Sequence, residues 1–227
     1  MGDRPYTLLS CSVSLDGYLG SASSRRLILS NEADFERVDE VRAGCDAILV
    51  GAETVRSDNP RLLIRSQARM DERTARGLAH TPIKVTVTER AHLEPDAAFF
   101  TAGDIDKLVY CPTGTVPKAR EALGHVATVV DGGDRVQMSE LSEDLHARGV
   151  RRLMVEGGAT VLTQFLTEGL ADELNLVVAP LFVGDSQARR FVDDGQFPWN
   201  PGRRAHLIEV RRIEDVVLLR YALSPRC

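Results

Sequence analysis

Apolar runs alternate along this chain with longer segments in which apolar residues recur at helical spacing. The short runs predict strands over residues 6–13, 46–50, 83–88, 107–111, 126–130, 152–155 and 173–179. The segments between them predict helices over residues 31–43, 117–123, 139–148 and 160–168. Such alternation is typical of an α/β fold with a mostly parallel central sheet flanked by helices. Two last strands, residues 207–210 and 216–222, are expected to pair antiparallel.

The helix predicted over residues 31–43 has only a weak apolar pattern. Phe35, Val38 and Val41 form a narrow stripe. The charged side chains around the stripe are expected to be mostly solvated; they are Asp34, Glu36, Arg37, Asp39 and Glu40. Ser30 precedes the helix and is its expected N-cap.

Two stretches interrupt the alternation. Residues 66–81 are polar and rich in charges, and predict an irregular excursion or a short helix. Residues 185–204 form a long segment that carries Gly, Pro and the only Trp, and loops of this length are often lids or subunit contacts. Since no low-complexity linker or internal repeat separates the elements, we expect a single domain over residues 1–227.

Composition narrows the class of protein. Of the 227 residues 43% are hydrophobic, which supports a substantial core, and the net charge of −5 does not favour nucleic acid as a partner. The sequence contains no run of about 18 apolar residues that would span a membrane, and its N-terminus lacks the apolar core of a secretion signal. The four cysteines lack metal-type spacing, so we expect reduced thiols, no metal site and a cytoplasmic location.

A glycine pair joins the strand over residues 152–155 to the helix that follows it. In the segment Glu156-Gly157-Gly158-Ala159-Thr160, small residues let backbone N–H groups approach an anion, and the start of the helix adds a favourable field. A nucleotide phosphate is commonly held in this way. The pair also suits an ordinary turn, and taken alone it favours that interpretation.

The strand over residues 46–50 runs into another turn of small residues. Thr54 offers a hydroxyl there, Asp58 a carboxylate, and Pro60 ends any helix. Asp58 and Asn59 are also common turn formers. The functional interpretation is a carboxylate outside the carboxyl end of a strand, where open α/β sheets bind their ligands.

Cations lie close to the Asp58 turn in the sequence. Arg42, Arg61 and Arg65 are candidates to bind a phosphorylated substrate. Arg42 also suits a helix end, where a cation complements the helix dipole. The pair Arg25 and Arg26 is equally compatible with a solvated loop and with contact to a substrate phosphate.

The end of the third predicted strand carries Thr88, Glu89 and Arg90. A hydroxyl and an arginine can hold the 2′-phosphate that distinguishes NADPH from NADH, whereas Glu89 opposes it. The patterns G-x-G-x-x-G and G-x-x-x-x-G-K-[ST] are absent, which disfavours the dinucleotide-binding and triphosphatase folds that carry them.

Several motifs occur together in a fixed order. They are Ser14-Leu15-Asp16-Gly17, Arg42-Ala43, Val50-Gly51-Ala52-Glu53-Thr54-Val55, Asp58-Asn59-Pro60-Arg61-Leu62, Glu156-Gly157-Gly158-Ala159-Thr160, Asp172-Glu173-Leu174 and Val178-Ala179-Pro180-Leu181-Phe182-Val183-Gly184. This set resembles the pyrimidine reductases of riboflavin biosynthesis, which share the dihydrofolate reductase-like fold. The resemblance covers residues 6–221, and no deaminase motif precedes it, so we expect the free-standing form.

The resemblance implies a chemistry and a set of site residues. The implied reaction is the NADPH-dependent reduction of a 5-phosphoribosylamino-pyrimidine to its ribitylamino form, in which Asp58 assists proton movement at the ribose. The implied cofactor contacts are Ser30, Thr54, Asp58, Thr88, Glu89, Arg90, Gly157, Gly158, Ala159 and Thr160. The implied substrate contacts are Arg42, Arg65 and Glu156, to which we add Arg26 and Arg61 because of their charge. A homodimer is implied as well.

Several positions depart from the family pattern, among them Arg26, which stands where some members have a serine. Ser10 stands where many bacterial members have a lysine, and Asn59 where many have an aspartate. Archaeal-type enzymes that act on the diamino compound also lack that lysine, so the deaminated and the diamino pyrimidine both stay open as substrates. The alternatives are a same-fold reductase acting on a dihydropterin or a specialised-metabolite pyrimidine, and a non-catalytic nucleotide-binding protein.

Overall fold

The computed structural model describes residues 3–22 and 27–227. The chain divides into two compact units. Among the described residues, unit 1 comprises 3–5 and 39–154, and unit 2 comprises 6–22, 27–38 and 155–227. Two elements continue from one unit into the other, helix α1 (Glu32–Ala43) and strand β6 (Arg152–Gly157).

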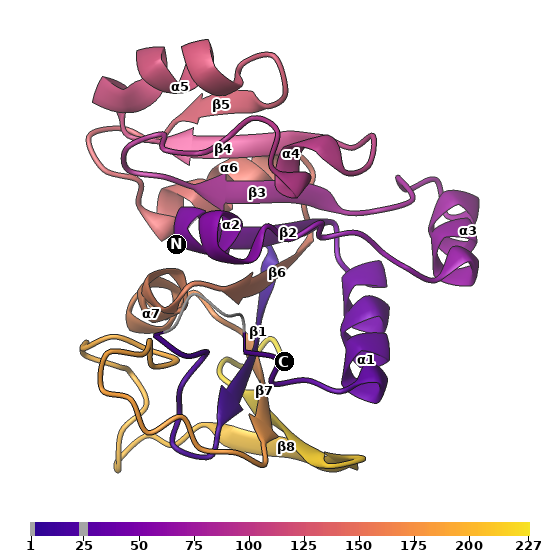
Figure 1. Ribbon diagram of the computed structural model, residues 1–227, viewed down its shortest axis with the longest axis vertical. Helices are drawn as coiled ribbons and strands as arrows, with labels where there is room; N and C mark the ends of the chain where they lie inside the picture. Colours follow the sequence, from indigo (N-terminus) through magenta and orange to yellow (C-terminus); the bar gives the residue numbers. More distant parts are fainter. Residues whose placement is uncertain (1–2, 23–26) are drawn as a thin grey trace. The chain divides into compact units, whose positions relative to one another are not determined.

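Unit 1 is built on parallel strands in the order β5-β4-β3-β2 (Figure 1). Their bounds are β2 (Ala47–Gly51), β3 (Ile83–Val87), β4 (Lys107–Cys111) and β5 (Thr128–Asp131). Every residue of β2 is buried, as expected for an apolar strand that is covered on both faces of a parallel sheet.

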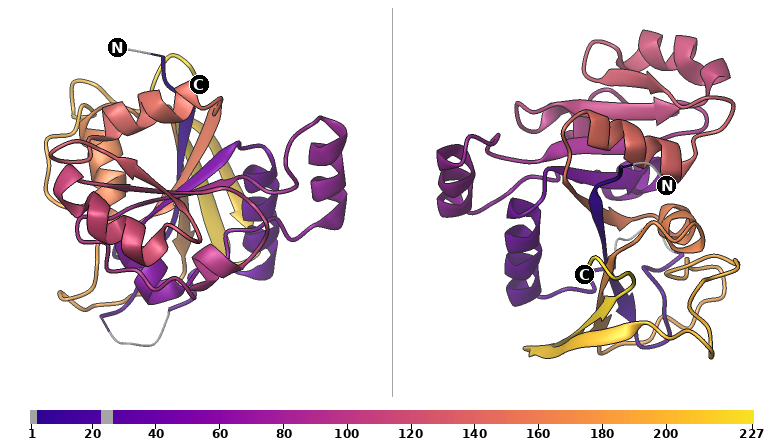
Figure 2. Two further views of the ribbon diagram at one scale, coloured as in Figure 1. Left: turned by 90° about the horizontal axis from the view of Figure 1, so that it is seen from above. Right: turned by 180° about the vertical axis from the view of Figure 1, so that it is seen from behind.

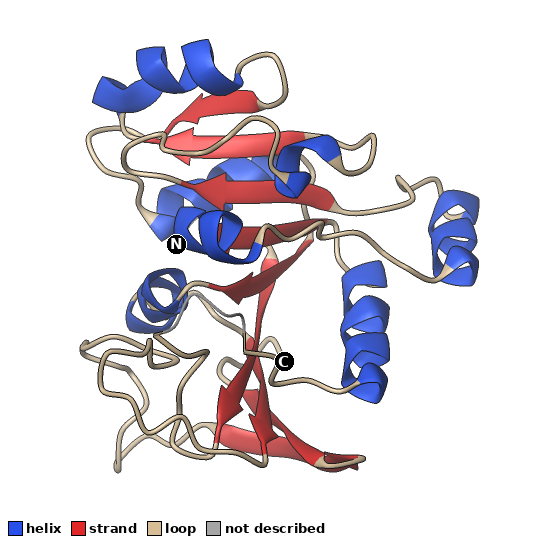
Figure 3. Cartoon of the chain, in the orientation of Figure 1, coloured by secondary structure: helices blue, strands red, loops and turns tan. Residues whose placement is uncertain are grey.

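Helices cover both faces of the unit 1 sheet (Figures 2 and 3). They are α2 (Ala52–Asp58), α4 (Ala98–Thr101), α5 (Val116–Leu123) and α6 (Met138–Ala147), with a 3-10 turn η1 (Thr113–Thr115) before α5. Helix α3 (Gln67–Ala75) stands apart at the side of this sheet (Figure 1). The Lys84 ammonium donates to the α4 carbonyl of Phe99 at 3.0 Å. The Tyr110 hydroxyl donates to Asp144 of α6 at 2.5 Å. Tyr110 pairs with Val87, three residues beyond Lys84 on β3, so the two side chains leave opposite faces of the sheet.

Unit 2 combines a parallel and an antiparallel part. Strand β1 (Tyr6–Ser14) pairs parallel with β7 (Glu173–Ala179). Strand β9 (Val216–Ala222) then pairs antiparallel with β7 on one side and with β8 (His206–Ile213) on the other. The predicted antiparallel C-terminal pair is therefore confirmed, and β8 is longer than the sequence pattern indicated.

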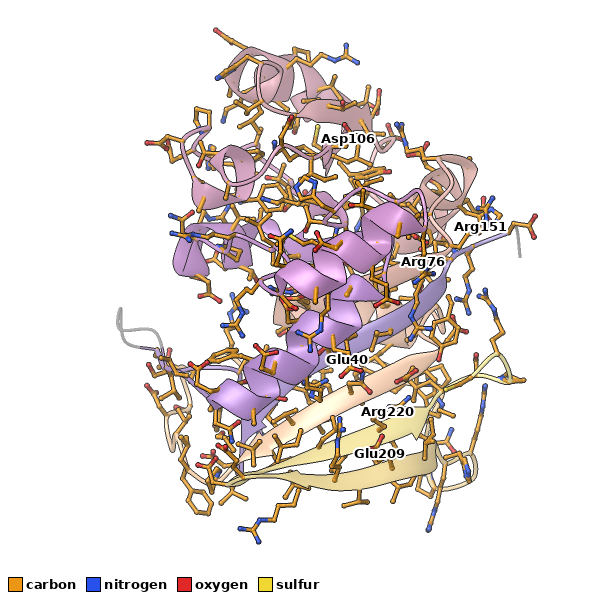
Figure 4. The ribbon with its side chains drawn as sticks, turned by 90° about the vertical axis from the view of Figure 1, so that its right-hand side faces the viewer. Glu40, Arg76, Asp106, Arg151, Glu209 and Arg220 are labelled. Carbon is orange, nitrogen blue, oxygen red and sulfur yellow. The ribbon has the colours of Figure 1, made fainter. Side chains whose placement is uncertain are left out.

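A network of charged groups crosses the antiparallel part of unit 2. Arg220 of β9 donates to Glu209 of β8 at 2.8 Å and to Glu173 of β7 at 2.9 Å. Figure 4 labels Glu209 and Arg220 on neighbouring strands. Glu173 is buried, and it also accepts the Tyr6 hydroxyl at 2.7 Å. A buried carboxylate needs such partners, because it loses its hydration on folding.

Helix α1 differs from its prediction in two ways. Its N-cap is Asn31 and not Ser30, because the Asn31 side-chain oxygen accepts the Asp34 N–H at 2.9 Å. Asp34, Arg37 and Asp39, which were expected to be solvated, are buried. Asp34 and Arg37 pair with each other at 2.7 Å, so the side of this helix that faces the protein carries charge as well as apolar groups.

The segment that follows β2 also differs in detail. The sequence predicted a turn around Asp58, whereas the structure has the short helix α2, which ends at Asp58. Asn59 adopts a left-handed conformation with φ 44° and caps it. A short helix was one of the two interpretations of residues 66–81, and α3 confirms it.

Candidate functional site

The glycine pair of unit 2 forms the turn between β6 and helix α7 (Ala159–Thr167). Gly157 has φ 143° and Gly158 has φ 88°, conformations that residues with a Cβ rarely adopt. A Cβ at Gly157 would meet open space, so backbone conformation alone selects glycine there. The first-turn N–H groups of a helix have no partner within the helix, and their dipoles favour an anion. This turn therefore offers an anion backbone donors and a favourable field.

Thr160 lies in the first turn of α7 and is exposed. Its hydroxyl donates to the Asp193 carboxylate at 2.9 Å. Asp193 belongs to the loop over residues 185–204 and is 33 residues away in sequence. Nothing in the sequence pattern indicated this contact, because neither residue belongs to a motif that contains the other.

Three further predicted or notable residues of unit 2 lie on or near strands. Ser30 shares a hydrogen bond of 2.9 Å with Ser12 of β1, so its hydroxyl is held against that strand. Glu156 is half-buried near the end of β6. Ser10 is buried in the middle of β1, opposite Asn175 of β7. Arg26 lies outside the described residues.

In unit 1, Thr54 and Asp58 lie on α2, directly after β2. Both are half-buried, and Asp58 accepts the Ser57 hydroxyl at 2.9 Å. The chain beyond Asp58 is held by tertiary contacts. Asn59 accepts the backbone N–H of Ala98 through its side chain at 2.6 Å, and Leu62 is buried in a left-handed conformation with φ 49°.

The predicted cations follow within the segment over residues 59–66, and they are presented to solvent. Arg61 and Arg65 are exposed. Arg42 instead reaches back from α1 and donates to the Leu63 carbonyl at 3.2 Å. The Asp39 carboxylate accepts the backbone N–H of Arg65 at 2.5 Å, and this hydrogen bond holds the segment over residues 59–66 against α1.

Asp39 was missed by the sequence interpretation, and its electrostatics explain its role. It also accepts the Ser66 N–H at 3.2 Å and the Arg69 guanidinium at 2.7 Å. Burial raises the pKa of Asp39, but the hydrogen bonds from Arg65 and Arg69 outweigh burial, so the pKa lies below its ordinary value. The carboxylate is thus held in its charged form beneath the arginine-bearing segment.

Thr88, Glu89 and Arg90 follow β3. The Thr88 side chain is buried and its hydroxyl accepts the Ala91 N–H at 3.1 Å, so it shapes the turn. Glu89 and Arg90 are exposed. Because β2 and β3 are neighbouring parallel strands, this turn and α2 leave the same carboxyl-terminal edge of the unit 1 sheet.

The described residues bear on other kinds of site as well. No group of three or more His, Cys, Asp or Glu side chains in this part of the chain is arranged to hold a metal ion. Within the same residues, no helix has the length and apolar character needed to cross a membrane. All four cysteines are free thiols, and burial raises the pKa of Cys11 to about 12.

Residues 5–219 match the family model of the RibD C-terminal domain. The chain belongs to this family. A relative from Methanothermobacter thermautotrophicus is 37% identical over 84% of this chain and 84% of its own length. One from Archaeoglobus fulgidus is 34% identical over 86% of this chain and 89% of its own. Both are named 2,5-diamino-6-ribosylamino-4(3H)-pyrimidinone 5′-phosphate reductase, which supports an oxidoreductase.

Solved structures of the family share the architecture. RibD of Acinetobacter baumannii superposes with a TM-score of 0.79 at 25% identity and covers 96% of this chain. This chain spans 58% of that RibD chain. The expected dihydrofolate reductase-like α/β fold, with a mostly parallel sheet and antiparallel C-terminal strands, is thereby confirmed.

Proposed function

We propose that this protein is an NADPH-dependent reductase of 2,5-diamino-6-ribosylamino-4(3H)-pyrimidinone 5′-phosphate in riboflavin biosynthesis. The observation that carries the proposal is the match to two archaeal reductases of that name at 34% and 37% identity over most of both chains. The RibD protein of Acinetobacter baumannii is 25% identical. Ser10 at the position of the bacterial lysine adds support, since archaeal-type enzymes share its absence.

Two turns are the proposed binding sites for the phosphates of the cofactor. The Gly157-Gly158 turn, Ala159 and Thr160 would bind the diphosphate, because backbone N–H groups and a hydroxyl converge at the start of α7. Arg90 is exposed after β3 and would bind the 2′-phosphate, beside Thr88 and Glu89. Ser30 and Thr54 would contact the nicotinamide half. When bound, NADPH supplies the hydride that reduces the former anomeric carbon.

The substrate end of the proposal rests on charge. Arg61 and Arg65 are exposed cations suited to the ribosyl phosphate, with Arg26 and Arg42 as further candidates. Glu156 would bind the pyrimidine through its carboxylate. Asp58 is the half-buried acid next to these cations in the sequence, and we assign it the proton transfer that accompanies opening of the sugar ring.

We also propose a cytoplasmic homodimer. Strand β8 is the last strand in the order of unit 2 and pairs with β9 on one side. Within the described residues, its other edge has no partner strand. It exposes Leu207, Ile208 and Val210. Exposed apolar edge strands commonly pair with a second chain. The free thiols agree with a reducing compartment.

The test is to mix the purified protein with NADPH and either the diamino or the deaminated ribosylamino-pyrimidine phosphate, and to follow the absorbance of the reduced nicotinamide. We expect oxidation with the diamino compound, and slower oxidation when NADH replaces NADPH. Asp58→Asn should lower kcat by roughly 100-fold or more, since general acid–base groups contribute about that much. Asp71→Asn is the control, because it removes the same charge at an exposed position on α3.

Other outcomes would redirect the assignment. Oxidation with the deaminated compound only would keep the reductase and change its substrate. Oxidation with a dihydropterin only would move the protein to another reaction on the same fold. Binding of NADPH without oxidation of any of these substrates would leave a nucleotide-binding protein and end the proposal.

A further inference from the structure

The loop over residues 185–204 is fastened to the start of α7 by Asp193. The Asp193 carboxylate accepts the Thr160 hydroxyl at 2.9 Å, and its backbone N–H donates to the Thr163 hydroxyl at 2.8 Å. Packing continues one turn further, where a Cβ on Gly195 would lie only 2.7 Å from the Thr167 methyl group. Figures 1 and 2 show the loop running beside α7.

The same loop is also fastened to the turn that follows β1. The Leu19 N–H donates to the Arg189 carbonyl at 2.9 Å, and the Phe191 N–H donates to the Gly17 carbonyl at 3.1 Å. The Arg190 guanidinium lies 4.9 Å from the centre of the Tyr18 ring. Asp193 therefore belongs to an ordered strap that connects the turn after β1 with α7.

The Asp193 carboxylate lies at the place where the proposed function puts the negatively charged diphosphate of the cofactor. The start of α7 is the expected position of the cofactor diphosphate, and a carboxylate is favoured there for the same electrostatic reason. The Thr160 hydroxyl has one proton and donates it to Asp193. It cannot donate that proton to a phosphate oxygen until Asp193 has left, and two anions so close repel each other.

We propose that Asp193 is a built-in competitor of the cofactor diphosphate, and that cofactor binding displaces its carboxylate from Thr160 and shifts the loop over residues 185–204 on α7. This inference rests on the proposed function, because it takes the cofactor phosphates to bind at the Gly157-Gly158 turn. It adds Asp193 as a residue that sets cofactor affinity. The loop is bound to α7 through Thr160 and Thr163 before the cofactor arrives, and through Thr163 alone of these two afterwards.

Binding of 2′-phospho-ADP-ribose tests the competition without the nicotinamide ring. Titration calorimetry would compare the wild type with Asp193→Asn, which keeps an acceptor for Thr160 and removes the charge, and with Asp193→Ala, which removes both. Both variants should bind on the order of tenfold more tightly than the wild type, as expected for loss of one nearby like charge. Asp194→Asn removes the charge of the exposed neighbour and should change the affinity little.

Trp199 gives a second readout. It is the only Trp of the chain and lies in the same loop, so its emission reports the loop directly. The probe should shift this emission in the wild type and shift it less in Asp193→Ala, where the carboxylate bond to Thr160 is already lost and only the backbone bond to Thr163 remains. Urea unfolding should show no gain in stability for Asp193→Asn, which separates tighter binding from a firmer fold.

Each contrary outcome has a distinct meaning. Equal or weaker probe binding by Asp193→Asn would overturn the competition while the cofactor site stands. Tighter binding by Asp193→Asn alone would trace the gain to the new amide donor and also overturn it. Probe binding with no change in Trp199 emission would overturn the shift of the loop on α7. Failure of the wild type and all variants to bind would overturn both this inference and the proposed cofactor site.

Discussion

At the scale of single residues, Lys84 is a fully buried cation. Its ammonium donates to the carbonyls of Phe99 and Ala102, at 3.0 and 2.5 Å, where α4 ends. The end of a helix is its negative pole, so these carbonyls partly replace lost water. Burial is the main reason that the pKa of Lys84 falls to about 8, with smaller contributions from the charges of Lys107 and Arg42.

Lys84 should make stability depend on alkaline pH. The folded state releases its proton near pH 8, whereas the unfolded chain keeps it up to about 10.5, so the free energy of unfolding rises with pH between these values. Relative to that of Lys84→Met, the free energy of unfolding of the wild type should rise by about 2 kcal/mol from pH 7 to 9.5, measured with urea. Lys118→Met, on the exposed side of α5, is the control. A difference that does not change with pH would contradict the prediction.

Gly157 allows a direct test of backbone conformation. Gly157→Ala and Gly114→Ala both add a methyl group in open space, but only Gly157 has a φ in the left-handed range. Gly157→Ala should therefore lower the free energy of unfolding by about 1–2 kcal/mol more than Gly114→Ala. It should also weaken binding of 2′-phospho-ADP-ribose, measured by calorimetry. Equal effects of the two substitutions would show that alanine adopts the backbone conformation of Gly157 without a loss of stability.

At the scale of elements, α1 acts on the segment over residues 59–66 through Asp39. The Asp39 side chain is fully buried, and it binds the backbone of Arg65 and Ser66 together with the side chain of Arg69. Arg42, from the same helix, binds the Leu63 carbonyl. This one helix therefore orders the segment on which the proposed substrate cations stand.

Asp39→Asn should loosen that segment. The amide keeps the shape of the side chain but loses the charge that offsets Arg69, so the free energy of unfolding should fall by about 2–4 kcal/mol. In the folded variant, KM for the phosphorylated pyrimidine should rise more than KM for NADPH, because the amide has one acceptor oxygen where the carboxylate uses two to bind Arg65, Ser66 and Arg69. Asp71→Asn is the matched control for charge. An equal rise in both KM values would assign Asp39 a purely structural role.

The elements that could be predicted from sequence are those whose signal is local. The apolar run of β2 and the glycine pair before α7 each carry their own pattern. The burial of Asp39 and Lys84 could not be predicted, because their partners come from other elements. Asp193 was missed for the same reason, since Thr160 lies 33 residues away. The site residues named by resemblance stay predictions until the variants are measured.

At the scale of the whole molecule, the free edge of β8 predicts self-association. Val210 is 61% exposed on that strand. A lysine there would oppose pairing of two edges, so Val210→Lys should convert the proposed homodimer into a monomer. Light scattering after size-exclusion chromatography gives the mass directly. Phe182→Lys, at an exposed position outside β8, should leave the dimer intact. A monomeric wild type would exclude the dimer.

The division of the chain into units also bears on how the protein is made. Unit 2 joins residues from both ends of the chain, and the contact from Thr7 to Asp172 spans 165 residues. On the ribosome β1 emerges first, yet both of its neighbouring strands, β6 and β7, follow only after strands β2 to β5. Strands β2 to β5 are complete by residue 131 and can pair while synthesis continues. Nascent β1 therefore stays unpaired until β6 and β7 are made, and a chain truncated before Arg152 would expose it to chaperones and proteases.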